Sequence, residues 1–257
     1  MGNQINKIIS FEISGMFAHF RKFYTNASSL SYLIPPRTAI TGMLASILEI
    51  PRDEYYDRFS ENKIRVSVSI PKGLKIRKQT QSMNYLHNKY FNLIAKGSEK
   101  GKVQHSQCKL ELLMYPAGEK IRYKIYVGGN KNNEDFQEIE SKLKNRKTGY
   151  GCYLGQRQFR AYIEFLDSYS EKDFVFLKES QILDSAVNKD NFIDYEIKDD
   201  LNIIEEQMPV AFKQTKSKIK GREPQNIKKI YFDRNGNRLT GKFSNCYRID
   251  DKYISFY

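Results

Sequence analysis

The sequence predicts an α+β fold: a ferredoxin-like (RRM/RAMP) βαββαβ domain with an inserted basic β-hairpin thumb and a small β-rich C-terminal extension. Strict alternation of apolar and polar residues marks strands at 7–14, 64–70 and 160–166. Two segments with helical periodicity lie between these strands. A weakly periodic basic segment, 71–107, is too long for a structureless loop. We therefore predict a domain at 1–166, with the insert at about 72–107, and an extension at 167–257.

The first strand is KIISFEIS, in which Ile9, Phe11 and Ile13 share one face. The first helix follows Pro35-Pro36, because proline is favoured where a helix begins, and it stops before Pro51. Its apolar face consists of Ile40, Met43, Leu44, Ile47 and Leu48. Its other face carries Gly42, Ala45 and Ser46, which are small enough for a second backbone to lie close.

Residues 109–115 and 121–127 are predicted to pair as a hairpin through the turn Pro116–Glu119. Asn133 is predicted to cap a helix that runs to about Lys147 and turns Phe136, Ile139 and Leu143 inward. A glycine cluster, 149–155, precedes the last core strand. Beyond 167, the expected elements are short strands at 173–177, 192–197 and 230–232, a turn at 233–237 and an extended end at 253–257.

The composition indicates a basic, tyrosine-rich protein. The chain has 257 residues, with 43 Lys+Arg against 30 Asp+Glu, 18 Tyr and 16 Phe. Such a charge field attracts phosphate, and tyrosine offers stacking faces, so nucleic acid is the first partner class. The three cysteines show no zinc-binding spacing, so we expect a reducing cytoplasm, no metal and no cofactor. The longest apolar stretch, 39–50, is too short to span a membrane, and the N-terminus lacks a signal-peptide core.

The positive charge is concentrated in two blocks. Residues 72–109 hold nine Lys/Arg and one acid, and residues 207–229 hold seven Lys/Arg and one acid. Between them, residues 167–206 hold twelve acids and four lysines. The basic blocks favour nucleic-acid contact, whereas the acidic block either repels nucleic acid or meets a basic protein.

The segment from Gly15 to Thr38 combines a strand exit, a cationic aromatic loop and a helix N-terminus. A helix N-terminus binds phosphate, because its first N–H groups lack partners inside the helix. We expect Arg21, Arg37 and Thr38 to contact phosphate, and we expect Arg37→Ala to weaken RNA binding without unfolding the protein. Core packing is an equally good interpretation for the aromatic rings of Phe17 and Phe20.

The string G-M-F-A-H-F-R-K-F, then S-S-L-S-Y and P-P-R-T-A-I-T-G-M-L-A-S-I-L, resembles the CRISPR-associated Cas-five family. These are RAMP-type subunits of type I Cascade complexes, and the chain looks most like the subtype I-B members. The resemblance covers residues 1–166 and includes I-R-V-S-V-S-I, R-K-Q-T-Q-S-M-N-Y-L and Y-L-G. The C-terminal third is not diagnostic.

The resemblance implies a subunit that caps the 5′ handle of crRNA and nucleates assembly of the Cascade backbone subunit and large subunit in antiviral defence. Target DNA would be met only indirectly, in a prokaryotic cytoplasm. The insert at 72–107 would be the thumb, and 149–155 a glycine loop whose N–H groups approach phosphate.

The predicted RNA-binding residues come from the N-terminal motif, the thumb and the glycine loop. They are His19, Phe20, Arg21, Lys22, Asn26, Ser28, Tyr32, Arg37, Thr38, Thr41, Arg77, Lys78, Gln79, Gln81, Asn84, Tyr85, Gly151, Tyr153, Gly155 and Gln156. Cations among them would hold phosphates, and Gln79, Gln81, Asn84, Gln156 and Tyr85 would read splayed bases.

The alternative is a metal-independent endoribonuclease that processes precursor crRNA, as some subtype I-C relatives do. Its candidate acid and base groups are His19, His87 and His105. The adjacent Lys-His pair of those relatives is absent, and a hydrogen-bonded structural role is the simpler interpretation of His19. An RRM-type regulator is disfavoured because the RNP1 signature is missing. A purely structural subunit, whose basic patches meet acidic protein, remains a further alternative.

Overall fold

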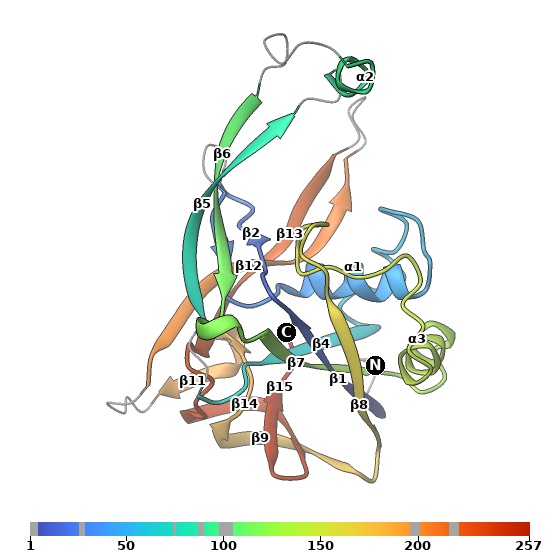
Figure 1. Ribbon diagram of the computed structural model, residues 1–257. Helices are drawn as coiled ribbons and strands as arrows, with labels where there is room; N and C mark the ends of the chain where they lie inside the picture. The colour runs from blue at the N-terminus through green and yellow to red at the C-terminus, as the bar shows by residue number, and fades with distance from the viewer. Residues whose placement is uncertain are drawn as a thin grey trace.

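The computed structural model describes residues 5–25, 29–73, 76–86, 90–97, 105–195, 201–215 and 221–257. Strands dominate the fold (Figure 1). They are β1 (Lys7–Gly15), β2 (Phe20–Arg21), β3 (Ser31–Tyr32), β4 (Ile64–Ser69), β5 (Arg77–Leu86), β6 (His105–Met114), β7 (Ile121–Gly129), β8 (Tyr162–Ser170), β9 (Phe174–Leu183), β10 (Val187–Asn188), β11 (Phe192–Tyr195), β12 (Ile203–Gln214), β13 (Arg222–Asp233), β14 (Leu239–Ile249) and β15 (Lys252–Ser255). The α-helices are α1 (Arg37–Ile47), α2 (Phe91–Ala95) and α3 (Glu134–Lys144).

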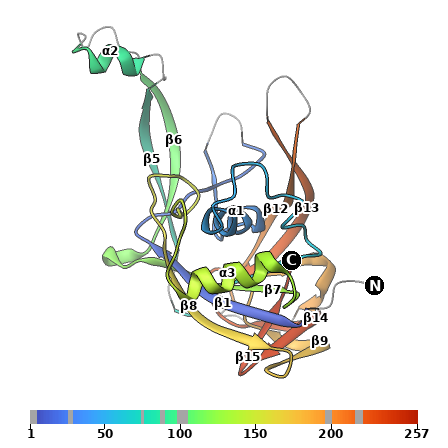
Figure 2. The same cartoon turned by 90° about the vertical axis from the view of Figure 1, so that its right-hand side faces the viewer.

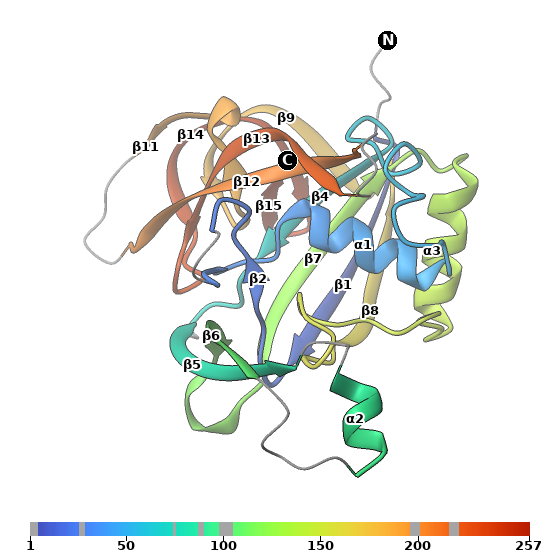
Figure 3. The same cartoon turned by 90° about the horizontal axis from the view of Figure 1, so that it is seen from above.

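The central sheet has the strand order β4-β7-β1-β8, and each neighbouring pair is antiparallel. α1 lies in the connection from β1 to β4, and α3 lies in the connection from β7 to β8. Both helices cover the same face of the sheet (Figure 3), because Ile9, Phe11 and Ile13 of β1 share one buried cluster with the apolar residues of both helices. The Asn133 side chain accepts a hydrogen bond from the N–H of Phe136 at 3.0 Å, which confirms the predicted cap of α3.

β5 and β6 form the arm predicted between the second and third core strands, in continuous register from Arg77–Met114 to Leu86–His105. The predicted hairpin between 109–115 and 121–127 is wrong. Both edges of β7 are occupied by β1 and β4. β6 pairs with β5 on one edge and makes backbone bridges to Ala18 and Ser29 elsewhere, so it belongs to the arm, whose paired strands reach Met114.

The C-terminal strands make two smaller sheets, β10-β13-β12 and β11-β14-β15, with β9 also paired to β14. The long β12–β13 hairpin and the β5–β6 arm project on the same side of the molecule, with α1 between them (Figure 2). These strands share the main core, since Met208, Ile230 and Phe232 join the cluster beneath α1. β8 also runs across position 166, so the division at 166 falls inside a strand of the central sheet.

The acidic segment 167–206 is partly neutralised within the fold. Five of its carboxylates form ion pairs with cations from other segments: Asp184 with Arg238, Asp190 with Lys228, Glu179 with Lys242, Glu205 with Lys229, and Glu206 with Lys22. The described residues include no group of three or more His, Cys, Asp and Glu placed to hold a metal ion. In the same part of the chain, no helix is long and apolar enough to cross a membrane.

Candidate nucleic-acid interface

A groove of about 610 Å³ lies along the small-residue face of α1. We call it the α1 groove. Its walls come from the N-terminal motif, α1 and the residues after it, the glycine loop and the β12–β13 hairpin. It is lined by Phe20, Arg21, Pro36, Thr38, Ala39, Gly42, Met43, Ala45, Ser46, Ile50, Arg52, Tyr55, Tyr150, Gly151, Cys152, Tyr153, Gly155, Phe212 and Arg222.

The glycine loop forms one wall because two of its glycines allow close backbone packing. The N–H of Tyr150 donates to the carbonyl of Ser46 at 3.2 Å, and the Ser46 hydroxyl donates to the carbonyl of Gly151 at 2.7 Å. Gly149 has φ +54°, and a Cβ there would lie 2.1 Å from the Ser46 oxygen. At Gly155, with φ +89°, a Cβ would lie 1.8 Å from the carbonyl oxygen of His19. The prediction that a second backbone lies close to this face of α1 is confirmed.

All charged residues that line the α1 groove are arginines: Arg21, Arg52 and Arg222. Arg52 and Arg222 share one carboxylate behind the wall, since Asp53 lies 3.4 Å from Arg52 Nε and 2.6 Å from Arg222 Nε. Burial raises the pKa of Asp53, but the hydrogen bond from Tyr56 and the charges of Arg222 and Arg52 outweigh it, and the pKa is lowered. The carboxylate is therefore ionised at neutral pH, and the three arginines retain an excess of positive charge.

Aromatic rings supply the second feature of the α1 groove. Tyr150 is 70% exposed and Tyr153 is 46% exposed, both on the glycine loop. Phe212 lies under the Arg222 guanidinium, 6.0 Å from its central carbon. Exposed rings beside arginines are the side chains on which single-stranded bases stack while their phosphates are neutralised.

Arg37 contradicts the sequence-based prediction of a phosphate contact. It is 2% exposed, and its guanidinium donates to the carbonyls of Val210 at 2.9 Å, Phe59 at 2.7 Å and Ile64 at 2.6 Å. Burial lowers its pKa to about 10, so it stays protonated at neutral pH. Thr41 is also buried, whereas Thr38, though 8% exposed, reaches the groove wall. The N-terminus of α1 is thus buried inside the protein, where Arg37 connects it to β12 through the carbonyl of Val210.

His19 is also buried, at 1% exposure, and both of its ring nitrogens are engaged. Nδ1 lies 2.8 Å from the carbonyl oxygen of Glu111, which can only accept, so Nδ1 carries the proton. Nε2 then accepts from the Ser29 hydroxyl at 3.0 Å. Burial lowers the pKa of His19, so the ring is neutral at pH 7. The simpler interpretation, a structural histidine, fits this geometry.

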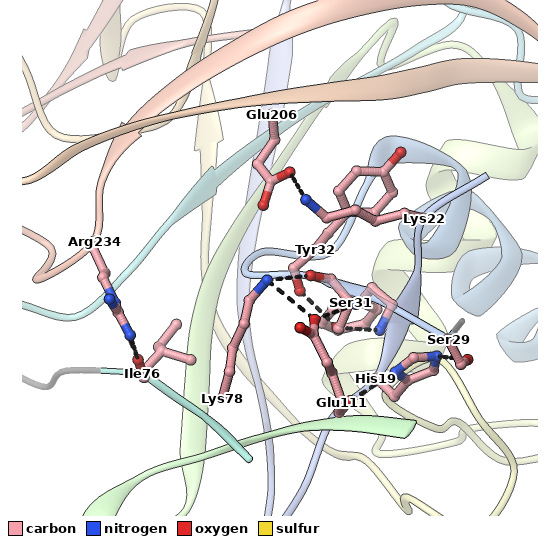
Figure 4. Close-up of polar contacts among 11 residues, drawn as sticks. His19, Lys22, Ser29, Ser31, Tyr32, Ile76, Lys78, Glu111, Glu206 and Arg234 are labelled. Atoms are coloured by element: carbon pink, nitrogen blue, oxygen red, sulfur yellow. Dashed lines mark hydrogen bonds and ion pairs between the residues drawn. The ribbon is translucent and has the colours of Figure 1, made fainter. Parts of the chain in front are cut away.

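The predicted contacts at Phe20, Lys22 and Tyr32 are contradicted in the same way. Phe20 and Tyr32 are 2% and 1% exposed, and the Tyr32 hydroxyl donates to the carbonyl of Gln207 at 2.6 Å. Lys22 forms an ion pair with Glu206 at 2.5 Å (Figure 4). This pair raises the pKa of Lys22 although burial opposes it. Of the four consecutive residues 19–22, only Arg21 is exposed, although the buried Phe20 ring also forms part of the groove lining.

The thumb, β5–β6, presents most of its predicted residues to solvent. Arg77, Gln79, Gln81, Asn84 and Tyr85 are exposed on β5. Lys78 is instead part of the base of the thumb. Its ammonium donates to the carbonyl of Ser31 at 2.7 Å and lies 3.3 Å from the Glu111 carboxylate (Figure 4).

The predicted N–H groups of the glycine loop are already used. The N–H of Gly151 donates to Thr148 O at 2.9 Å, and that of Gly155 donates to Tyr153 O at 3.0 Å. This contradicts phosphate binding by these two groups. Gln156, which follows the loop, is partly exposed. Asn26, Ser28 and His87 lie outside the described residues, as does the side chain of His105.

Sequence reasoning missed Arg52, Tyr150, Phe212 and Arg222. Two signals pointed towards them: Arg222 belongs to the second basic block, and Tyr150 interrupts the glycine cluster. Phe212 lies in the same block but is not basic, and Arg52 carried no signal, because only the folded chain brings the β12–β13 hairpin to the end of α1.

Comparison with known proteins places the chain in a family. Residues 8–218 match the family described as "CRISPR-associated protein (Cas_Cas5)". No curated protein matches the chain. It is similar in fold to a CRISPR protein from Archaeoglobus fulgidus, at 11% identity and TM-score 0.57, with 98% of this chain and 100% of that chain covered. It is also similar to a chain of a CRISPR RNA-guided surveillance complex, at 13% identity and TM-score 0.53, with 91% and 90% covered. Because the family match extends over most of its length, the chain belongs to the CRISPR-associated Cas5 family.

Proposed function

We propose that this protein is a non-catalytic, crRNA-binding subunit of a type I CRISPR effector complex and that its α1 groove holds the 5′ handle of the crRNA. The observation that carries the proposal is the groove itself, where three arginines, Arg21, Arg52 and Arg222, lie beside exposed tyrosines and only Arg52 and Arg222 pair with a carboxylate, that of Asp53. Arginine neutralises phosphate, and aromatic faces stack unpaired bases. Because the chain belongs to the CRISPR-associated Cas5 family, a CRISPR transcript is the RNA that we propose.

The thumb supports a second part of the same proposal. The β5 residues Arg77, Gln79, Gln81, Asn84 and Tyr85 are exposed, and they include cationic, amide and aromatic groups. We assign this surface to the RNA backbone and bases at one end of the strand, beyond the α1 groove. The backbone and large subunits of a subtype I-B-like Cascade would then assemble on this protein, and target DNA would be met only through them.

The finer description of the fold belongs to this proposal as well. The order β4-β7-β1-β8, with α1 and α3 as crossovers, supports the ferredoxin-like βαββαβ interpretation of the core. We retain 1–166 as the RAMP domain and 167–257 as its extension. Since β8 crosses that boundary and Met208 and Ile230 enter the main core, we expect the extension to fold with the domain.

The test uses the full chain and a labelled RNA of the CRISPR repeat in EDTA, analysed by gel shift and on a denaturing gel. We expect binding that requires the 5′-handle segment and leaves the RNA intact. Arg21→Gln/Arg52→Gln should reduce the slope of log K against log[salt] by about 1.4 and the affinity about 25-fold at 0.1 M salt, since each phosphate contact contributes about 0.7.

The matched control removes two exposed cations near β9, at the bottom of Figure 1: Lys172→Gln/Lys178→Gln. If the control lost as much RNA affinity as Arg21→Gln/Arg52→Gln, the binding would depend on total charge and not on the groove, and the proposal would be refuted. Discrete metal-independent cleavage would instead establish the endoribonuclease alternative. Because both ring nitrogens of His19 are already hydrogen-bonded, His87 and His105 would then be the candidate acid and base groups.

A further inference from the structure

A second cluster of exposed cations lies on the face of the central sheet opposite α1 and α3. Ser14 of β1 is directly opposite Arg122 of β7 and also directly opposite Tyr162 of β8. Cross-strand partners project on the same side, and side chains alternate along β1. Since Ile13 faces the helices, Arg122 and Tyr162 lie on the other face. The C-terminal sheet covers the Ile8 end of this face and leaves the Ser14 end open.

Tyr162 holds two cations against its ring. The ring is 52% exposed, the Lys120 ammonium lies 4.5 Å from its centroid, and the Arg160 guanidinium carbon lies 5.8 Å from it. Lys120, Arg122 and Arg160 are all exposed. We call these four residues the Tyr162 cluster.

The cations of the Tyr162 cluster form no ion pair with a carboxylate in the described part of the chain. Glu12 and Glu164 lie opposite each other on the same face, two residues along β1 from Ser14, and Glu119 is near in sequence, yet none of the three is paired with Lys120, Arg122 or Arg160 there. Cations that share one ring repel each other, and the weak attraction of the ring only partly offsets this. An anion bound between them would remove the repulsion. By contrast, five carboxylates of segment 167–206 are paired with cations of this chain.

The Tyr162 cluster is continuous with the α1 groove. Arg160 forms an isolated β-bridge with Tyr153, which lines the groove. The N–H of Leu154 donates to Phe159 O at 2.7 Å, and that of Ala161 donates to Cys152 O at 3.0 Å, so residues 152–161 make one tight loop. Gly15 lets this loop pack on β1, since a Cβ there would lie 2.8 Å from Arg160 O. A strand that leaves the groove beside Tyr153 meets Arg160 next.

We propose that the Tyr162 cluster is a second RNA contact, which binds the phosphodiester backbone of the strand as it leaves the α1 groove across the loop 152–161. Lys120 and Arg160 neutralise phosphate, and Tyr162 is a positioning residue that holds both cations. This inference rests on the proposed function of the groove. It names RNA as the occupant because the cations are unpaired and continuous with the groove; an acidic protein partner is an outcome of the test.

The experiment measures salt-dependent affinity for two handle RNAs, one of about four nucleotides that fills only the groove and one of about twelve nucleotides. The longer probe is made with extensions at the 5′ end and, separately, at the 3′ end. For Lys120→Gln/Arg160→Gln we expect unchanged binding of the short RNA. For one of the extended RNAs we expect about 25-fold weaker binding at 0.1 M salt and a slope of log K against log[salt] reduced by about 1.4.

Two further variants separate position from charge. Tyr162→Phe keeps the ring and should match the wild type, whereas Tyr162→Leu should reduce the salt slope for the extended RNA alone. Lys172→Gln/Lys178→Gln again controls for net charge. If the wild type and the Lys120→Gln/Arg160→Gln variant bind every RNA equally, the Tyr162 cluster is not an RNA contact, and an acidic protein is the favoured partner of this face. Failure of the wild type to bind any of the RNAs overturns the groove proposal, and the inference with it.

Discussion

The two sides of α1 carry arginines with opposite roles. On the inner side, Arg37 is 2% exposed and donates to three backbone carbonyls from β12 and from the residues that precede and begin β4. On the outer side, Arg21, Arg52 and Arg222 line the α1 groove, and Arg52 is 79% exposed. Arg37 and Arg21 both belong to the segment that the sequence singled out. The difference shows that an arginine's role depends on what already occupies its donors.

The inner arginine should be the largest contributor to stability. Arg37→Ala leaves three buried carbonyls without donors, so we expect a loss of at least about 3 kcal/mol in the free energy of unfolding. Urea denaturation measures it, with Arg52→Ala as the exposed control, expected within about 0.5 kcal/mol of the wild type. If Arg37→Ala were as stable as the wild type but bound RNA more weakly, Arg37 would be an RNA-binding residue like the groove arginines, and the two sides of α1 would not differ in role.

On the outer side, the glycine loop packs closely against α1, and substitution of Gly149 tests how much this packing contributes to stability. The φ of +54° at Gly149 and the 2.1 Å distance from a Cβ to Ser46 O predict that Gly149→Ala destabilises by about 2 kcal/mol or more. At Gly151, nothing lies within 4 Å of a Cβ, and only the φ of +85° is unfavourable, so Gly151→Ala should cost about 1 kcal/mol. Thermal denaturation of the two variants compares them, and equal losses would show that the close approach to α1 contributes nothing.

Arg21 and Lys22 sharpen the comparison to two adjacent residues. Arg21→Gln should weaken handle RNA about 5-fold at 0.1 M salt, as expected for one phosphate contact. Lys22→Gln should leave affinity within about 2-fold but destabilise the protein, because it strands the buried Glu206 carboxylate. Paired binding and unfolding measurements on both variants check this, and the reverse pattern would exchange their roles.

His19 should have the smallest effect, and it depends on pH. Burial lowers its folded-state pKa below the usual value, so the unfolded chain binds the proton more readily. Its contribution to stability is therefore complete above the unfolded pKa of about 6.5 and declines as pH falls towards the folded pKa. Unfolding between pH 7.5 and 5 should show wild type losing more stability than His19→Gln. Parallel curves would mean that His19 is not a buried neutral group.

The local patterns of the core were sufficient to predict its elements. β1, α1, β4 and α3 follow from alternation, from the spacing of Ile40, Met43 and Ile47, and from the Asn133 cap. β12 and β14 were missed. Pro209 interrupts β12, and β12 tolerates it because β12 is an edge strand, with β13 as its only sheet neighbour among the described residues. In β14, Gly241 and Asn245, at φ +52°, break the alternation.

The candidate site was less predictable, because its residues are far apart in the sequence. Arg21 and Arg222 are about two hundred positions apart in the chain, and their common groove exists only after β12 and β13 pack beside α1. The first turn of a helix can face a partner or solvent, and at Arg37 the partner is Val210 on β12. Composition favoured a nucleic-acid partner, but burial decided which cations line the groove.

The anchoring of the thumb gives it the mechanics of a lever. Ten residues of β5 at about 3.3 Å each make an arm of roughly 30 Å, so a rotation of about 5° at its base would move its tip by about 3 Å. Lys78 holds that base to Ser31 and Glu111, and Arg234 holds Ile76 at 3.0 Å (Figure 4). These bonds therefore limit how far the thumb can rotate. A neighbouring subunit that contacts α2 at the far end would then meet it in a nearly fixed position.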